Sequence, residues 1–228
     1  GRYTYEVRES RGHELAKEHP VEADLVIPVP DSSIPAALGY AAQSGIPYGQ
    51  AIIKNRYTDR TFIKPDQRLR QLEVDLKFNI VKPKIAGKRL VVVDDSIVRG
   101  NTMKRLVAAL RHQGAGEIHL RSSSPPLRHP CYFGIDIPQE SELIAAGRTI
   151  QEVADYIGVD SLGYLSIGGL GRSIAAAGNV VDLSDDQANA LLHREFCYGC
   201  MERHGWPFNP AEAQSFAPIT IQRQATQV

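Results

Sequence analysis

The sequence has no excess of charge of either sign, because its 26 Lys and Arg residues balance its 26 Asp and Glu residues. It therefore lacks the basic field with which proteins attract nucleic acid, and composition gives no indication of such a partner. It also lacks an apolar run of membrane-spanning length and a signal peptide. These absences predict a soluble, cytoplasmic protein with no membrane partner.

Cysteine is scarce as well. The 228 residues include only Cys131, Cys197 and Cys200, and the last two form a CxxC pair. This spacing is typical of zinc, iron–sulfur and redox sites, whereas a structural disulfide is disfavoured in the cytosol. Three thiolates fall short of the four that a closed zinc or 4Fe–4S site usually requires. The residues alone leave three interpretations open: an iron–sulfur site, a zinc site completed by His193 or His204, and three plain thiols.

What the sequence does contain is an alternation of apolar and helical segments. Strands are expected at residues 25–27, 49–54, 90–93 and 117–122, and helices at residues 6–19, 34–43 and 103–113. Beyond Ser141 the pattern turns helical, at residues 141–146, 149–157 and 184–192, each opening at a Ser or Thr that suits an N-cap. Strands that alternate with helices predict an α/β protein with a parallel sheet flanked by helices. We expect a core at residues 1–140, a mostly helical C-terminal extension at 141–209 and a polar tail at 210–228.

The most informative segment, LVVVDDSIVRGNT, runs from Leu90 to Thr102. Its four apolar residues predict a strand buried on both faces, and Asp94 and Asp95 follow at the carboxyl end, where open α/β sheets bind ligands. Gly100 lets the next loop approach an anion without a Cβ in the way, and the helix that follows begins with N–H groups that attract phosphate. Carboxylates accept hydrogen bonds from sugar hydroxyls or bind Mg²⁺. A solvated Asp-Asp turn would explain the acid pair alone, but the whole segment favours a ligand with a ribose diol and a phosphate.

The same segment resembles the signature of type I phosphoribosyltransferases, which use phosphoribosyl pyrophosphate. Its exact amino-acid sequence is most similar to the signature of one branch of that family, the glutamine phosphoribosylpyrophosphate amidotransferases of purine synthesis. Further stretches share this resemblance, at residues 29–32, 54–57, 60–63, 123–126 and 129–136. The resemblance extends from about Tyr5 to Cys200 and implies the type I phosphoribosyltransferase fold.

The resemblance also implies roles for individual residues. Asp94 and Asp95 would hold the ribose hydroxyls and act in catalysis, and Ser32 would join them around Mg²⁺. The loop residues that would cradle the 5-phosphate are Ser96, Arg99, Gly100, Asn101 and Thr102, and further substrate-binding residues would be Asp31, Ser32, Lys54 and Arg56. Asn101 departs from the signature, which often has Thr at this position. For residues 29–33, an ordinary capped turn between a strand and a helix is the alternative.

Residues 56–81 are basic and have no clear period. Long structureless segments are uncommon in compact domains, unless they serve as active-site lids. A basic lid could close over a pyrophosphate and exclude water, and the resemblance implies a loop that orders when substrate binds. A solvated basic helix near residues 66–78 is the alternative.

Some members of the resembled family carry a 4Fe–4S cluster, and the resemblance implies that Cys131, Cys197 and Cys200 are three of its ligands. The fourth cysteine of those proteins precedes the stretch that resembles Tyr5–Arg8. The family also has an N-terminal glutaminase domain, whose terminal cysteine releases ammonia from glutamine, and nothing in this sequence matches it. We therefore expect this chain to be the C-terminal piece of a longer protein, which holds the synthase half only.

The implied reaction is displacement of pyrophosphate from phosphoribosyl pyrophosphate by ammonia, which gives 5-phosphoribosylamine. Expected partners are a glutaminase domain that supplies ammonia, purine nucleotides as inhibitors, and further copies of the chain in a homo-oligomer. A non-catalytic regulatory domain that binds phosphoribosyl pyrophosphate is the alternative, although the sequence offers no DNA-binding module. A base phosphoribosyltransferase would need an aromatic hood for a nucleobase, which we do not identify.

Overall fold

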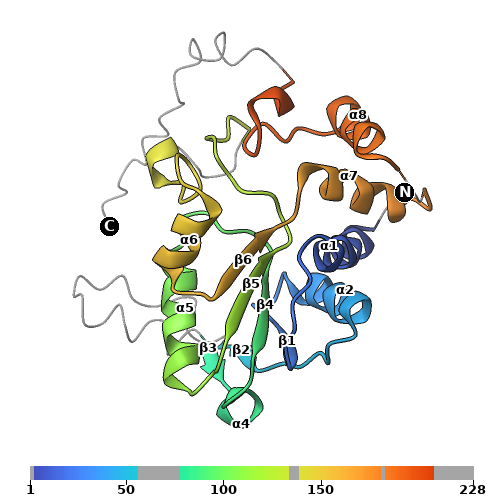
Figure 1. Cartoon of the computed structure of the whole chain (residues 1–228). Helices are drawn as coiled ribbons and strands as arrows, with labels where there is room; N and C mark the ends of the chain where they lie inside the picture. The colour runs from blue at the N-terminus through green and yellow to red at the C-terminus, as the bar shows by residue number, and fades with distance from the viewer. Residues whose placement is uncertain (1–2, 56–77, 134–138, 181–182, 208–228) are drawn as a thin grey trace, which may run out of the picture.

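A parallel sheet of four strands forms the centre of the molecule (Figure 1). The computed structural model describes residues 3–55, 78–133, 139–180 and 183–207. The strands lie in the order β1 (Leu25–Pro28), β4 (Leu90–Asp94), β5 (Ile118–Ser122) and β6 (Ser161–Tyr164). β4 pairs in parallel with both β1 and β5, so it lies inside the sheet. The parallel sheet expected from the sequence is confirmed.

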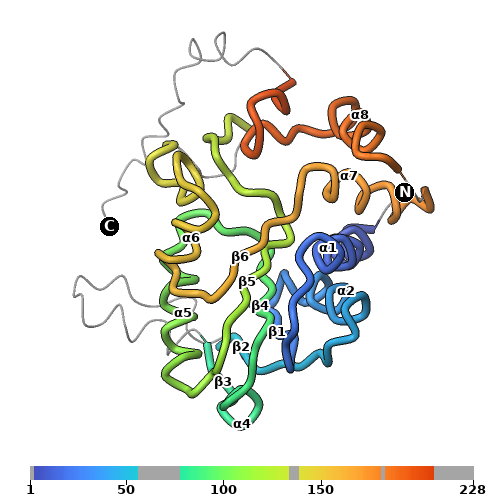
Figure 2. Tube along the Cα trace, in the orientation of Figure 1, coloured from blue at the N-terminus to red at the C-terminus, as the bar shows by residue number. Residues whose placement is uncertain are grey.

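Helices cover both faces of this sheet, which explains why β4, one of its two inner strands, is apolar from Leu90 to Val93. Along β4, Leu90 and Val92 pack into one core, Val91 and Val93 pack into the other, and all four are 0 % exposed. The first face is covered by α5 (Asn101–His112) and α6 (Ile150–Ile157), and the second by α1 (Thr4–Glu18) and α2 (Ile34–Ser44). Beside α1, the second layer continues into α7 (Ile167–Ala176) and α8 (Asp185–Glu195), as the trace in Figure 2 shows.

Helices α1 and α2 approach each other closely through two glycines. A Cβ atom added to Gly12 would lie 1.9 Å from the carbonyl oxygen of Ala36, and one added to Gly39 would lie 2.0 Å from that of Glu9. Neither position can hold a side chain unless the two helices move apart. The backbone of α1 is therefore seated directly on α2, which in turn packs on β1 and β4.

A second, smaller sheet lies at the edge of the first. It pairs β2 (Ile52–Lys54) antiparallel with β3 (Phe78–Ile80), and α4 (Lys82–Ile85) follows. A bridge between Tyr48 and Val26 joins the segment before β2 to the edge of β1. Of the expected lid, residues 56–77 lie outside the described residues, and residues 78–80 form β3.

The segment after residue 139 differs from the expectation. The helix expected at residues 141–146 is wrong, because the structure has only the 3₁₀ helix η1 (Glu140–Glu142), which a turn follows. Leu143, Ile144 and Ala145 are buried in succession, with exposed fractions of 1, 3 and 2 %. The N–H of Ile144 donates to the carbonyl oxygen of Val98 at 2.8 Å, so a distant segment takes the place of the residue four positions earlier that an α-helix would require.

The sequence also predicts neither a strand nor a helix at residues 158–183, where β6 and α7 occur. Their glycine-rich sequences, SLGY and IGGLG, are local loop signals that pairing with β5 and packing on α1 override. The expected N-caps Thr149 and Ser184 are confirmed, and each forms a reciprocal capping box with the third residue of its helix. The division between core and extension at residue 140 stays a prediction, and β6 lies within that extension.

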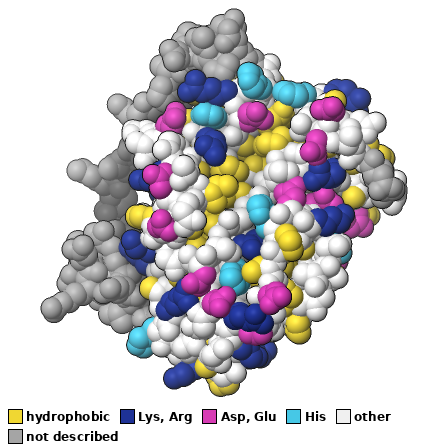
Figure 3. Space-filling model, viewed as in Figure 1, with side chains coloured by type: hydrophobic (Ala, Val, Ile, Leu, Met, Phe, Trp, Pro, Cys, Tyr) yellow, Lys and Arg dark blue, Asp and Glu magenta, His cyan; other side chains and the backbone are white. Residues whose placement is uncertain are grey.

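On the face shown in Figure 3, basic and acidic side chains are interspersed, and hydrophobic side chains are visible between them. None of the helices in the described part of the chain combines the length and the apolar character that crossing a bilayer requires.

An ionic cluster attaches the second-layer helices to α1. Arg172 of α7 contacts Glu14 at 2.7 Å and Glu18 at 2.8 Å, and it also pairs with Asp185 at the start of α8. Glu18 in addition accepts a hydrogen bond of 2.6 Å from the hydroxyl of Ser166, the N-cap of α7. The Arg172 side chain is 26 % exposed, whereas Glu14 and Glu18 are only 13 and 18 % exposed. Arg172 is therefore shared by two partly buried carboxylates, of which Glu14 also pairs with Lys17 at 2.7 Å.

We expect Arg172→Met to lower the free energy of unfolding by about 1–3 kcal/mol, because it removes the cation that pairs with the partly buried Glu18 and one of the two cations that pair with Glu14. Urea denaturation measures this change. The matched control is Arg194→Met, since Arg194 is 74 % exposed and pairs with its neighbour Glu195. The control should change the free energy of unfolding by less than about 0.5 kcal/mol. Equal losses in the two variants would contradict the importance of the cluster.

Candidate functional site

The acid pair lies where three strand ends meet. Asp94 is the last residue of β4, and the chain leaves β1 and β5 on its two sides. The N–H of Val29 donates to the carbonyl oxygen of Val93 at 2.9 Å, and the N–H of Ser123 donates to that of Asp94 at 2.8 Å. These bonds hold the loops after β1 and β5 against the end of β4. This is the carboxyl edge at which open α/β sheets bind ligands.

The two carboxylates differ in their surroundings. Burial raises the pKa of Asp94 to about 7, and the negative charge of Asp95 acts in the same direction. The N–H of Asp95 donates to Oδ1 of Asp94 at 2.9 Å, which only partly opposes this effect. Asp95 itself accepts a bond of 3.4 Å from the hydroxyl of Ser96. Asp94 is therefore a carboxyl group whose negative charge is poorly compensated at neutral pH.

One nearby cation was not anticipated from the sequence. Arg11 of α1 is close enough to Asp95 for the carboxylate to favour its charged form, while burial and the neighbouring Arg8 lower the pKa of Arg11. Its Nε atom is buried without a hydrogen-bond partner among the described residues. Arg11 lies on a polar helix far from Asp95 in sequence, so no local pattern indicates this approach.

The donor set at this edge fits Mg²⁺. Carboxylate oxygens are the ligands that this ion prefers, and Asp94 and Asp95 supply them side by side. Burial and, to a lesser extent, the adjacent charge of Asp95 raise the pKa of Asp94, and a divalent cation would stabilise the ionised carboxylates against both effects. The structure thus supports the residue types expected for a magnesium site.

The loop after the acid pair leads into α5 through a left-handed glycine. Gly100 is the N-cap of α5 and has φ of 72°, a left-handed conformation that favours glycine. A Cβ atom at this position would also lie 2.3 Å from Cδ1 of Ile144. The absent Cβ thus serves packing against Ile144, which differs from the approach to an anion expected from the sequence. Asn101 and Thr102 follow in the exposed first turn of α5.

Two residues from the C-terminal half contact this loop. Glu142 of η1 pairs with Arg99, whose Nε and Nη2 lie 2.7 and 2.5 Å from Oε2 of the carboxylate. Tyr156 of α6 donates a hydrogen bond of 2.7 Å to Oδ1 of Asn101. Both contacts join residues more than forty positions apart in sequence, so the sequence pattern could not predict them. In this structure the Arg99 guanidinium is therefore paired with a carboxylate of the protein itself.

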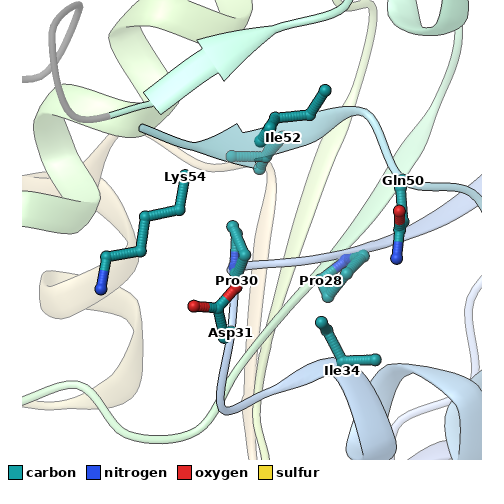
Figure 4. A pocket seen from close by; sticks show the side chains of 8 residues that line it. Pro28, Pro30, Asp31, Ile34, Gln50, Ile52 and Lys54 are labelled. Atoms are coloured by element: carbon teal, nitrogen blue, oxygen red, sulfur yellow. The ribbon is translucent and has the colours of Figure 1, made fainter. Parts of the chain in front are cut away.

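The loop after β1 forms a cavity with β2. The cavity has a volume of about 230 Å³ and is lined by Pro28, Pro30, Asp31, Ile34, Gln50, Ile52, Ile53 and Lys54. Asp31 and Lys54 extend from opposite elements toward the same side of it (Figure 4). Ser32 is half-buried beside it, and the peptide bond between Pro30 and Asp31 is cis. Ser33, the N-cap of α2, is buried and donates its hydroxyl hydrogen to the carbonyl oxygen of Val29.

The structure therefore brings most of the expected site residues to one edge of the sheet. Asp94, Asp95 and Ser96 continue into the loop that holds Arg99, Gly100, Asn101 and Thr102, and the adjoining strand end supplies Asp31, Ser32 and, from β2, Lys54. Arg56, the remaining expected residue, lies outside the described residues. The individual roles of these residues stay predictions.

The three cysteines come from two segments that lie together. The N–H groups of Arg128 and His129 donate to the carbonyl oxygen of Cys200 at 2.8 and 3.0 Å. Burial raises the pKa of the Cys200 thiol, and Cys131 and Cys197 act in the same direction. Nevertheless, no group of three or more His, Cys, Asp or Glu side chains in the described residues is placed to hold a metal ion. With three thiols and no such arrangement, the expected 4Fe–4S cluster is not supported by this geometry.

Comparison with known proteins identifies the family. Residues 7–123 match the family model described as the phosphoribosyl transferase domain. The chain belongs to this family. The matched residues contain the first three strands of the main sheet, the cavity after β1 and the entire loop from Asp94 to Thr102.

Similar curated proteins are amidophosphoribosyltransferases. The chain is 55 % identical over 167 residues to that of Methanothermobacter thermautotrophicus, an alignment that covers 73 % of this chain and 35 % of the relative. It is 55 % identical over 168 residues to that of Synechocystis, which covers 74 % of this chain and 34 % of the relative. This phosphoribosyl transferase domain thus spans about a third of the length of these relatives.

Two solved structures have the same fold. The glutamine phosphoribosylpyrophosphate amidotransferase of B. subtilis, complexed with ADP and GMP, is 45 % identical, with a TM-score of 0.74 over 87 % of this chain and 41 % of that one. A structure described as the allosteric regulatory enzyme of purine biosynthesis is 45 % identical, with a TM-score of 0.76 over 89 % of this chain and 41 % of that one. The expected type I phosphoribosyltransferase fold and the resemblance to amidotransferases are confirmed.

The raised pKa of Asp94 predicts a pH-dependent stability. The folded protein holds the Asp94 proton up to about pH 7, whereas an aspartate in the unfolded chain ionises with its ordinary pKa of 3.8. The stability that this group contributes is therefore fully present below about pH 3.8 and is lost progressively as the pH rises to about 7. Compared with wild type, Asp94→Asn should gain on the order of 2 kcal/mol in free energy of unfolding between pH 5 and pH 8.

Urea titrations at the two pH values measure this gain as a difference between variant and wild type, which removes the contributions of all other groups. Asp155→Asn is the control, because Asp155 is an exposed carboxylate on α6. A difference between Asp94→Asn and wild type that stays the same at pH 5 and pH 8 would show that Asp94 ionises normally.

Proposed function

We propose that this domain transfers the phosphoribosyl group of phosphoribosyl pyrophosphate to ammonia and thereby forms 5-phosphoribosylamine and pyrophosphate. The observation that carries this proposal is the arrangement at the end of β4. There, a poorly compensated acid pair leads directly into the left-handed turn at Gly100 and the exposed first turn of α5. Such an arrangement suits a ligand that carries a diol next to a phosphate.

The proposed chemistry needs no nucleophilic side chain, because ammonia supplies its own lone pair. As the bond forms between nitrogen and C1 of the ribose, the bond between C1 and the pyrophosphate oxygen breaks, and that oxygen keeps the electron pair. The ammonium group of the product then loses one proton to solvent. Catalysis would come from positioning and from stabilisation of charge that develops in the transition state.

Different residues at this edge of the sheet would bind different parts of the substrate. Asp94 and Asp95 would accept hydrogen bonds from the ribose hydroxyls, and backbone and side-chain donors from Ser96 to Thr102 would hold the 5-phosphate. Asp31, Ser32 and Lys54 line or adjoin the cavity where the pyrophosphate would lie. The chemistry that Mg²⁺ supplies, when held by Ser32, Asp94 and Asp95, is neutralisation of charge on that leaving group.

The relatives support the wider features of this proposal. The greater length of the relatives and the description of the B. subtilis protein as a glutamine phosphoribosylpyrophosphate amidotransferase favour an additional domain that supplies ammonia from glutamine, as the sequence led us to expect. The ADP and GMP bound to the B. subtilis protein favour purine nucleotides as inhibitors. The homo-oligomer and the cytoplasmic location stay predictions, as does the 4Fe–4S cluster, which iron and sulfide analysis of the purified protein would test.

Pyrophosphate release from phosphoribosyl pyrophosphate tests the proposed function directly. With Mg²⁺ and ammonium, we expect turnover by wild type, and a loss of about 100-fold or more in kcat/KM for Asp94→Asn and for Asp95→Asn, because each removes charge from the acid pair. The control is Asp186→Asn, which changes an exposed carboxylate on α8 and should retain wild-type turnover.

The outcomes of this assay separate the competing functions. Tight binding of phosphoribosyl pyrophosphate without turnover under any condition would favour the regulatory alternative. Absence of both binding and turnover would overturn the proposed function. Activity with glutamine as well as ammonium would contradict the expectation that this chain holds only the synthase half.

A further inference from the structure

We propose that Tyr156 is a positioning residue, which orients the Asn101 side chain so that its N–H groups face the 5-phosphate. This inference rests on the proposed function, since it assigns a donor to the phosphate site of that reaction. The observation behind it is the hydrogen bond of 2.7 Å from the Tyr156 hydroxyl to Oδ1 of Asn101. The partners come from α6 and from the first turn of α5, on the same side of the sheet.

The chemistry of the Asn side chain explains why an orienting partner matters. An amide has an acceptor oxygen on one side and two N–H donors on the other, and rotation by half a turn exchanges them. The oxygen would repel a phosphate, whereas the N–H groups would bind it. A hydroxyl that donates to Oδ1 fixes the oxygen toward α6 and leaves both N–H hydrogens for another acceptor.

Contacts on the other sides of Tyr156 hold the ring in place. The ammonium group of Lys104, one turn further along α5, lies 4.2 Å from the ring centroid. A Cβ atom on Gly100 would lie 3.6 Å from Cε1 of the ring, so the ring packs beside the left-handed turn. α6 itself is anchored by Val153, Ala154 and Ile157, which are 1 to 2 % exposed. The tyrosine is 38 % exposed, yet α5, the turn and α6 all constrain it.

The inference predicts that the effect of Tyr156 depends on the residue at position 101. A threonine hydroxyl rotates freely and can donate to a phosphate without an orienting partner. The test is therefore a double-mutant cycle with Tyr156→Phe, Asn101→Thr and both together. Phenylalanine keeps the ring, its packing at Gly100 and its contact with Lys104, and removes only the hydroxyl.

In the Asn101 background, Tyr156→Phe should raise KM for phosphoribosyl pyrophosphate about tenfold, with kcat within about twofold of wild type. In the Asn101→Thr background, the same substitution should change KM less than about twofold. Tyr5→Phe, which removes the hydroxyl of an exposed tyrosine on α1, is the control. An equal loss in both backgrounds would show a merely structural role and overturn the inference.

A second readout does not require turnover. The side-chain amide signals of Asn101 can be assigned in ¹⁵N NMR spectra by their absence in Asn101→Thr. Inorganic phosphate should shift these signals in wild type and leave them unshifted in Tyr156→Phe. If phosphate shifts the signals equally in both proteins, or in neither, the inference is wrong. If they respond as expected but pyrophosphate is never released, the proposed function fails while the orientation of Asn101 stands.

Discussion

The hydrogen-bonded ladder that β4 forms with β1 and β5 determines where every group of the candidate site lies. Because both neighbours run parallel to β4, all three strands end at the same edge, and the loops that leave them converge on Asp94. The alternating burial of Leu90 to Val93 in two separate cores fixes the register of this inner strand. A shift of the register by one residue would exchange the two faces of the strand and direct the Asp94 side chain into a hydrophobic core. The packing of four apolar side chains therefore determines the position of the acid pair.

The same constraint explains the charge properties of the site. An aspartate at the end of a fully covered strand cannot be well solvated, and a second aspartate follows it in the chain. The local sequence thus places two negative charges side by side with little solvation. Among the described side chains, Arg11 of α1 compensates them only in part, because it approaches Asp95. Sites that bind charged ligands commonly contain such poorly compensated groups, because the ligand or its metal ion completes the charge balance.

The sequence was sufficient to predict the parts of the fold that depend on local patterns. The apolar run of β4 and the N-caps at Thr149 and Ser184 could be predicted because each is determined by a few consecutive residues. β6 and α7 could not, because partners distant in sequence stabilise their glycine-rich segments. Likewise, the contacts of Glu142 with Arg99 and of Tyr156 with Asn101 exist only once α5, η1 and α6 are folded together.

The paired glycines between α1 and α2 affect how saturation mutagenesis data on this protein should be interpreted. Gly12 and Gly39 take no part in the proposed chemistry, yet each faces a carbonyl oxygen at a distance that excludes even a methyl group. In a saturation mutagenesis screen, both positions would tolerate substitution as poorly as the acid pair does. A map that equates intolerance with catalysis would therefore place a spurious site beneath α1, on the side of the sheet opposite α5 and α6. Abundance measured alongside activity distinguishes the two kinds of position, since changes at the glycines deplete folded protein whereas changes at the acid pair leave it intact.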